Sequence, residues 1–197
     1  GLVNLAPIGV LAIQGDFLEH RNMLDSIGIE SVEVRLPEQL ENIDGLIIPG
    51  GESTTIVQLI DIYEMRQPLI EKVRNGLAVW GTCAGMIVIA KNLKDKRPDP
   101  LGLMDIEVSR NAFGRQINSF ETDLDINGID GPPMHAIFIR APLVTEIGNG
   151  VEILAEVDQG KPVAVKQNRI LATSFHPELT EDPRMHAMFA NIAHSMQ

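Results

Sequence analysis

Short apolar runs alternate with segments of helical spacing through the first half of the chain. Apolar runs of strand length cover residues 8–13, 31–36, 44–48 and 77–80. Such runs are typical of strands that are buried on both faces of a sheet. Helical spacing and helix-end signals between the runs predict helices over residues 17–27, 54–63, 68–75 and 86–90. Strands that alternate with helices favour a parallel sheet with right-handed crossovers.

The second half of the chain has a different pattern. Runs of strand-forming residues follow one another with little helical sequence between them, at 106–109, 119–126, 136–139, 151–157, 163–167 and 170–174. Turn signals such as Asn127-Gly128 and Asn149-Gly150 separate several of them. A last helix is expected over residues 184–196. The sequence therefore predicts an α/β fold: one domain over residues 1–197, with a mostly parallel central sheet, helices on both faces and an antiparallel extension.

Composition limits the class of protein. The 197 residues are 44% hydrophobic and 22% charged, which is ordinary for a globular protein. A net charge of −11 disfavours binding to nucleic acid or to an anionic membrane surface. No apolar run approaches the roughly 20 residues that a membrane span requires. We therefore expect no membrane segment. Because one cysteine cannot form an internal disulfide, we also expect a cytoplasmic protein.

That single cysteine, Cys83, lies in the segment Gly81-Thr82-Cys83-Ala84-Gly85 between a predicted strand and a predicted helix. Gly-x-Cys-x-Gly at such a turn is the cysteine form of a nucleophile elbow. The start of a helix favours a thiolate, and the backbone N–H of Ala84 is a candidate donor to an oxyanion. A free cysteine is also commonly a small buried apolar residue. The spacing alone does not decide between these two interpretations.

A histidine and a glutamate follow another apolar strand, in the segment His176-Pro177-Glu178. The carboxyl end of a strand in a parallel sheet is where sites form. A carboxylate at Glu178 can orient the imidazole of His176 and stabilise its cationic form, which in turn supports a thiolate. The alternative is a solvent-exposed loop without a catalytic role. The other histidines have no comparable context, and no metal site is predicted from them. They are His20, His135, His186 and His194.

Paired glycines follow the strand predicted over residues 44–48, in the segment Pro49-Gly50-Gly51. Glycines permit positive φ and close approach of the backbone, so the amide of Gly51 is a candidate second oxyanion donor. A phosphate-binding turn is the alternative. The Gly-x-x-x-x-Gly-Lys pattern is absent, however, and Glu52 would repel a phosphate. An acidic residue at this position better suits a ligand that carries an ammonium group.

These three segments together resemble the signatures of class I (triad) glutamine amidotransferases. Five segments narrow the resemblance to the glutaminase subunits of pyridoxal 5′-phosphate synthase. They are LAIQGD at 11–16, PGGESTT at 49–55, RNAFGRQ at 110–116, FIRAP at 138–142 and HPELT at 176–180. The resemblance extends from about residue 8 to the last predicted helix, and it implies the three-layer fold of that class.

The resemblance implies hydrolysis of L-glutamine to L-glutamate and ammonia through a cysteine thioester. Cys83 would be the nucleophile, His176 and Glu178 would complete the triad, and the amides of Gly51 and Ala84 would form the oxyanion hole. Glu52 would lie near the α-ammonium of glutamine and Arg110 near its α-carboxylate. The full implied set of glutamine-binding residues is Gly51, Glu52, Ser53, Arg110, Ile139 and Arg140.

The resemblance also implies a partner, because nothing in this chain can build a pyridine ring. The ammonia would pass to a separate (β/α)₈-barrel synthase subunit, in a large ring assembly, for pyridoxal 5′-phosphate (vitamin B6) biosynthesis. No cofactor is expected. Three alternatives stay open: the glutaminase of another amidotransferase such as imidazole glycerol phosphate synthase, a non-enzymatic regulator on the same fold, and a cysteine hydrolase or peptidase of related architecture.

Overall fold

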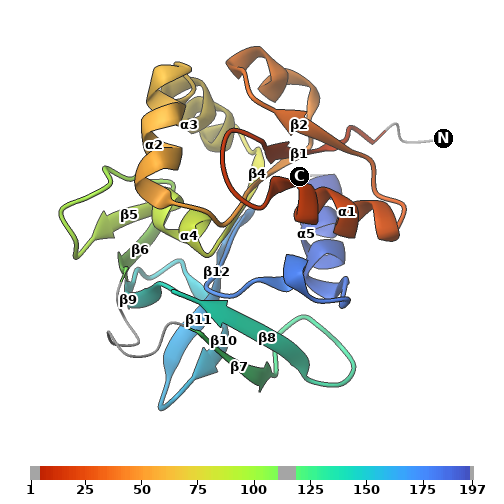
Figure 1. Cartoon of the computed structure of the whole chain (residues 1–197), viewed down its shortest axis with the longest axis vertical. Helices are drawn as coiled ribbons and strands as arrows, with labels where there is room; N and C mark the ends of the chain where they lie inside the picture. Colours follow the sequence, from red (N-terminus) through yellow and green to blue (C-terminus); the bar gives the residue numbers. More distant parts are fainter. Residues whose placement is uncertain (1–4, 111–118, 196–197) are drawn as a thin grey trace.

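The computed structural model describes residues 5–110 and 119–195. Within them, a seven-stranded sheet of order β10-β11-β12-β4-β3-β1-β2 forms the centre of the molecule (Figure 1). The strands from β12 to β2 are parallel, and β10 and β11 continue the sheet antiparallel. This confirms the predicted parallel sheet with an antiparallel extension. The strands are β1 (Ile8–Leu11), β2 (Ser31–Val34), β3 (Gly45–Ile48), β4 (Ala78–Thr82), β10 (Glu152–Val157), β11 (Lys161–Gln167) and β12 (Ile170–Thr173).

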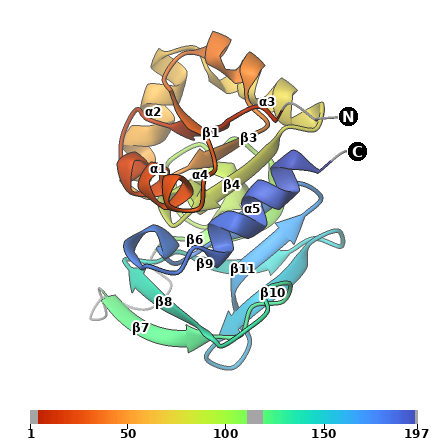
Figure 2. The same ribbon diagram turned by 90° about the vertical axis from the view of Figure 1, so that its right-hand side faces the viewer.

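Helices cover both faces of this sheet, as predicted (Figures 1 and 2). In β3, the side chains of Leu46 and Ile48 enter one core cluster, whereas Ile47 enters the cluster on the opposite face. Apolar residues are therefore required at successive positions, which explains the continuous apolar run of this strand. One face carries α1 (Phe17–Ser26) and α5 (Arg184–His194); the other carries α2 (Ser53–Ile62), α3 (Arg66–Arg74) and α4 (Ala84–Ile89).

The remaining strands form two smaller sheets. A three-stranded sheet has the order β5 (Ala90–Leu93), β6 (Met104–Ser109) and β9 (Leu143–Ile147), and β7 (Ser119–Leu124) pairs with β8 (Met134–Ile139). The sequence pattern predicts neither β5 nor β9. Lys91 and Asn92 of β5 are polar and exposed, so only the pairing of β5 with β6 makes this segment a strand.

Several helix boundaries differ from the prediction. Helix α3 begins two residues before Pro68, which is tolerated because an amide in the first turn has no acceptor within the helix. Glu52, rather than Ser53 or Thr54, caps α2, and its side chain accepts a hydrogen bond from the amide of Thr54 (3.1 Å). The last helix ends at His194, and residue 196 lies outside the described part of the chain.

Two short 3-10 helices, η1 (Pro37–Asn42) and η2 (Pro177–Leu179), also occur in segments without a predicted element. Each contains a proline in its first turn, where the fixed φ of proline suits a helix start. Across residues 5–110 and 119–195, every helix is too short or too polar to cross a bilayer.

Candidate active site

The glycine, cysteine and histidine segments that the sequence singles out lie at one edge of the central sheet. Gly50 and Gly51 follow β3, Cys83 follows β4, and His176 comes shortly after β12. Because β3, β4 and β12 are adjacent and parallel, their carboxyl ends meet at this edge. The topology thus brings together three segments that are far apart in the sequence.

Cys83 occupies a strained turn between β4 and α4. Its φ of 52° and ψ of −108° lie outside the regions that residues with a side chain ordinarily adopt. The amide of Cys83 donates to the carbonyl of Thr173 (2.8 Å), and a Cβ at Gly85 would overlap the carbonyl of Ile48. The thiol is buried and contacts the carbonyl of Ile139, with Sγ 3.6 Å from the oxygen. This geometry is that of a nucleophile elbow.

His176 joins the cysteine to a buried carboxylate. Its Nδ1 lies 2.6 Å from Oε2 of Glu178, whose side chain is fully buried, and Cys83 is near enough to raise the pKa of the imidazole. A Cβ at Gly50 would lie 2.7 Å from Cε1 of His176 and 3.4 Å from Cβ of Cys83. Glycine at this position leaves the space in which the imidazole and the cysteine meet.

The environment of His176 favours its cationic form. Burial alone lowers the pKa of His176, but the hydrogen bonds and charges of Cys83 and Glu178 outweigh burial and raise it to about 10. Burial also raises the pKa of Glu178, against the opposing effect of the hydrogen bond with His176. The contact of 2.6 Å is typical of a charge-assisted bond, so we describe the two residues as an imidazolium–carboxylate pair. A proton is then available beside the thiol at neutral pH.

Asp16 provides a second carboxylate, with Oδ2 3.6 Å from Nδ1 of His176. Ligand atoms of Asp16, His176 and Glu178 all lie within 4.8 Å of one another, a spacing that a metal ion can bridge. However, Nδ1 of His176 is already engaged by Glu178, and the raised pKa of the imidazole favours a proton at this position. The cluster is therefore described as part of the cysteine–histidine site.

Glu52 and Arg110 lie together beside this site. A guanidinium nitrogen of Arg110 is 3.4 Å from Oε1 of Glu52. The amide of Glu52 donates to the side-chain oxygen of Gln14 (2.8 Å), and the guanidinium of Arg110 donates to the carbonyl of Arg97 (3.1 Å). An exposed carboxylate next to a guanidinium can bind the two opposite charges of an amino acid. The rest of the segment at 111–116 lies outside the described residues.

The other predicted site residues have the following places. Ser53 is buried at the start of α2, and Ala84 is the first residue of α4. The carbonyl of Gly50 accepts a hydrogen bond from the amide of Asp16 (2.9 Å), which orients the peptide group that precedes Gly51. Ile139 ends β8 with its carbonyl at the thiol. Next to it, Arg140 is exposed and has a φ of 47°.

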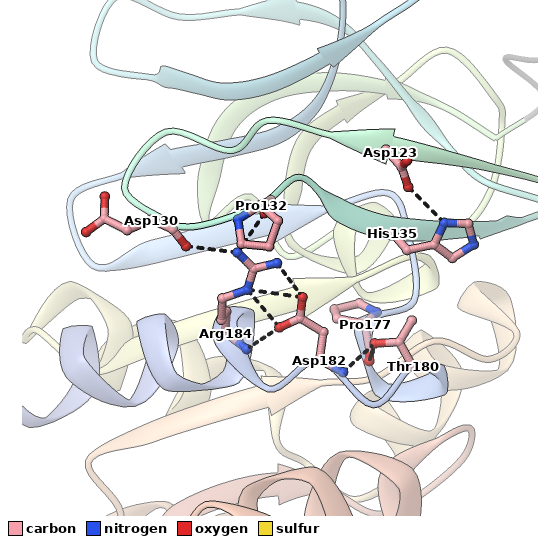
Figure 3. A network of polar contacts seen from close by, with 8 residues as sticks. All are labelled: Asp123, Asp130, Pro132, His135, Pro177, Thr180, Asp182 and Arg184. Carbon is pink, nitrogen blue, oxygen red and sulfur yellow. Dashed lines mark hydrogen bonds and ion pairs between the residues drawn. The ribbon is translucent and has the colours of Figure 1, made fainter.

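The loop that carries His176 and Glu178 is fixed from two sides. On one side, the amide of His176 donates to the carbonyl of Ile137 in β8 (2.9 Å). On the other, Arg184 donates to the carboxylate of Asp182. It also donates to the carbonyls of Asp130 and Pro132, both at 2.8 Å (Figure 3). The segment between the triad residues and α5 is thereby attached to the turn between β7 and β8.

Two further histidines lie beneath the site, and their sequence context indicates no role for them. His20 in α1 and His186 in α5 are fully buried, and Nδ1 of His20 lies 2.8 Å from Nε2 of His186. Nε2 of His20 is 3.7 Å from Oε1 of Glu178. The available signal was a histidine on the apolar face of a helix, beside Met185 and Phe189 in the case of His186.

Comparison with known sequences identifies a family and close relatives. The model of the SNO glutamine amidotransferase family matches residues 10–194. The chain is 54% identical over 190 residues to "Pyridoxal 5′-phosphate synthase subunit PdxT" of Frankia alni, covering 95% of each chain. A protein of the same name from Dehalococcoides mccartyi is 55% identical over 188 residues, which are 94% of this chain and 96% of the relative.

Comparison with solved structures gives the same fold. A structure described as a glutamine amidotransferase superimposes with a TM-score of 0.89 at 49% identity, covering 94% of this chain and 98% of the other. PurLQS from Thermotoga maritima has a TM-score of 0.70 at 15% identity, covering 95% of this chain and 99% of the other. The second similarity concerns the fold alone.

Proposed function

This chain belongs to the SNO glutamine amidotransferase family, and from that premise we propose that it hydrolyses L-glutamine and supplies the ammonia to a pyridoxal 5′-phosphate synthase. The observation that carries the proposal is the buried contact of Cys83, His176 and Glu178 at the end of the parallel strands. The names of relatives more than 50% identical over nearly the whole chain support the choice of synthase.

Acyl transfer through a thioester is the chemistry that this arrangement suits. The thiolate of Cys83 attacks the side-chain amide carbon of glutamine, and the amides of Gly51 and Ala84 stabilise the resulting oxyanion. The proton on His176 passes to the amide nitrogen as the C–N bond breaks, and ammonia leaves. Water then gives a proton to His176 and attacks the thioester, so that glutamate is released and the thiolate is restored. Glu178 orients the imidazole throughout.

Recognition of the amino-acid end of glutamine is assigned to the charged pair beside the nucleophile. We assign Glu52 to the α-ammonium and Arg110 to the α-carboxylate, because the two side chains lie next to each other with opposite charges. Gly51, Ser53, Ile139 and Arg140 complete the set of glutamine-binding residues. Binding would separate the contact of 3.4 Å between Glu52 and Arg110 and replace it with two contacts to the substrate.

The partner in this proposal is the synthase subunit. The relatives are named as subunits of pyridoxal 5′-phosphate synthase, which supports a protein partner that uses the ammonia. We propose that this partner is a (β/α)₈ barrel in a large ring assembly, and that docking raises a weak glutaminase activity of the isolated chain. The glycines at 50–51 provide a device for this activation, because loss of one oxyanion donor typically lowers a rate by roughly 10²–10³.

The glutaminase of another amidotransferase is the second candidate function. It is less well supported, since the similarity to PurLQS at 15% identity concerns only the fold, whereas relatives at 54–55% identity carry the synthase name. A regulator without activity and a peptidase are further outcomes that a measurement of product and substrate preference distinguishes.

Ammonia release from glutamine, measured with and without the synthase subunit, tests the proposal. His135 provides a matched control for His176, because it also contacts carboxylates (Asp123 at 3.0 Å) but is exposed. We expect Cys83→Ala and His176→Asn to lower glutamine hydrolysis by at least about 10³-fold, whereas His135→Asn retains it.

Binding of each variant to the synthase subunit serves as the second readout and should be unchanged. Retained hydrolysis in Cys83→Ala would exclude the cysteine mechanism. Hydrolysis of peptides in preference to glutamine would favour the peptidase, and full activity without any effect of the synthase would contradict the proposed activation.

A further inference from the structure

A chain of buried polar groups continues from the triad into the core between α1 and α5. His20 and His186 are each 0% exposed, and Nδ1 of His20 is 2.8 Å from Nε2 of His186. The second nitrogen of His20, Nε2, faces the hydroxyl of Thr82 at 3.2 Å and Oε1 of Glu178 at 3.7 Å. The proposed mechanism uses neither histidine.

The two carboxylate oxygens of Glu178 have different surroundings. Oε2 is 2.6 Å from His176, whereas Oε1 is buried and has no hydrogen-bond partner among the described residues. A buried carboxylate oxygen without a partner is costly, and the polar group that faces it is the imidazole of His20. The charged groups around Glu178 and His20 are His176 and Asp16, which contacts the imidazole of His176.

Both buried histidines are neutral. Burial is the largest cause in each case. It lowers the pKa of His186 to about 3. Burial, with smaller electrostatic effects of His186 and of the cationic His176, lowers the pKa of His20 well below 6.5. Each ring therefore carries one N–H and one bare nitrogen. The hydrogen bond between them requires one ring to donate and the other to accept.

The surroundings of the outer nitrogens select one of the two arrangements. Nδ1 of His186 is buried without a hydrogen-bond partner among the described residues. A proton there would be a buried donor without an acceptor, and the lone pair of His20 would then face Oε1 of Glu178. With the proton of His186 on Nε2, that N–H donates to Nδ1 of His20, and the N–H of His20 lies on Nε2, facing Thr82 and Glu178. The second arrangement avoids both penalties.

We propose that His20 is a positioning residue for Glu178, directing an N–H at its outer oxygen, and that His186 acts through His20 by fixing which nitrogen carries the proton. This role rests on the proposed function for the reaction that it serves. The N–H dipole stabilises the carboxylate form of Glu178 and holds its other oxygen on His176. The imidazolium of His176 is stabilised in turn.

The nitrogen chemical shifts of the histidines in the full chain give a direct test, because they report which nitrogen of each ring is protonated. We expect neutral His20 and His186 at pH 7, both protonated on Nε2. Protonation of His186 on Nδ1, or a cationic His20, would overturn the assignment. This measurement needs neither substitution nor activity.

Substitutions of His20 separate positioning from packing. His20→Phe fills the space without a donor, whereas His20→Gln retains an N–H near the position of Nε2. We expect the pKa of His176 to fall by about one unit in His20→Phe, because the N–H dipole that faces the Glu178 carboxylate is lost, and to recover in His20→Gln. His186→Leu, which leaves Glu178 untouched, should shift the pKa in the same direction by less.

Two chemical readouts complete the test. Cys83 is the only cysteine, so alkylation by iodoacetamide reports its reactivity without glutamine. We expect His20→Phe to slow alkylation at pH 7, and in the complex with the synthase to lower kcat for glutamine by about 10-fold with KM unchanged. Unchanged titration of His176 and unchanged alkylation in His20→Phe and His186→Leu would leave the pair a packing feature. Absence of ammonia release from the unsubstituted chain in the complex with the synthase would contradict the proposed function but not the positioning.

Discussion

The meeting of thiol and imidazole depends on the absence of one side chain. Gly50 faces both Cys83 and His176, and its carbonyl is held by the amide of Asp16. The sequence indicated a glycine turn with close backbone approach. It did not indicate that the space next to Gly50 is occupied by the imidazole, because His176 is more than a hundred residues away in the chain.

Addition of a methyl group at this position should therefore impair catalysis more than folding. In Gly50→Ala, the new Cβ would lie 2.7 Å from Cε1 of His176, so the ring must move. We expect glutamine hydrolysis to fall by about 10²-fold, the typical effect of a displacement of about 1 Å in a catalytic group. Steady-state ammonia release measures this effect. The control is Gly150→Ala, where the nearest atom is 3.5 Å away and activity should be retained. Equal activity of the two variants would contradict the assigned position of His176.

At the scale of elements, the loop between β12 and α5 is positioned on one side by β8 and on the other by the side chain of Arg184. Arg184 binds Asp182 and two carbonyls of the turn between β7 and β8 (Figure 3). Arg66 has a closely similar set of partners, namely Asp61 and the carbonyls of Asp99 and Pro100, but it lies in α3. The two arginines make the same kinds of contact, but the partners of Arg66 lie outside the loop that carries His176.

This similarity allows a controlled comparison. We expect Arg184→Gln and Arg66→Gln each to lower the free energy of unfolding by about 1–2 kcal/mol, as is typical for loss of charge-assisted hydrogen bonds. Only Arg184→Gln should also reduce glutamine hydrolysis, because it releases the loop of His176. Urea unfolding and ammonia release test the two effects. A loss of activity of the same size in Arg66→Gln would show that stability alone accounts for it.

The acid range adds a second check on Arg184. Its hydrogen bonds lower the pKa of Asp182, so this pair contributes stability above the ordinary pKa of aspartate. The contribution is lost as the pH falls through the lowered pKa. The difference in stability between Arg184→Gln and the unsubstituted chain should therefore shrink below about pH 4.

At the scale of the whole molecule, the histidine pair joins both helices of one layer to the sheet and the site. His20 comes from α1, His186 from α5, and Trp80 of β4 packs against both rings at centroid distances of 5.7 and 4.7 Å. Protonation of either ring would place an uncompensated charge in this core. The stability of the fold therefore depends on pH through two residues that take no part in the proposed reaction.

This coupling predicts acid instability. Burial lowers the pKa of His186 to about 3, so between pH 6.5 and 3 the unfolded chain binds a proton that the folded chain excludes. Stability must therefore fall as the pH falls, by about 2 kcal/mol between pH 7 and pH 5 for this histidine. In His186→Leu, the loss between these two pH values should be smaller by about that amount, measured by urea unfolding. An equal loss in both chains would contradict a neutral, buried His186.

Local sequence determined the elements and the chemistry of each segment. Continuous apolar runs identified β1, β3 and β4, and the Gly-x-Cys-x-Gly turn identified the environment of Cys83, because periodicity and turn geometry depend on neighbouring residues. The tertiary structure alone decided which distant groups meet. It paired β9 with β6, Glu52 with Arg110, and His20 with His186, residues separated by as many as 166 positions. Such contacts depend on how helices pack across a sheet, and no local pattern encodes that arrangement.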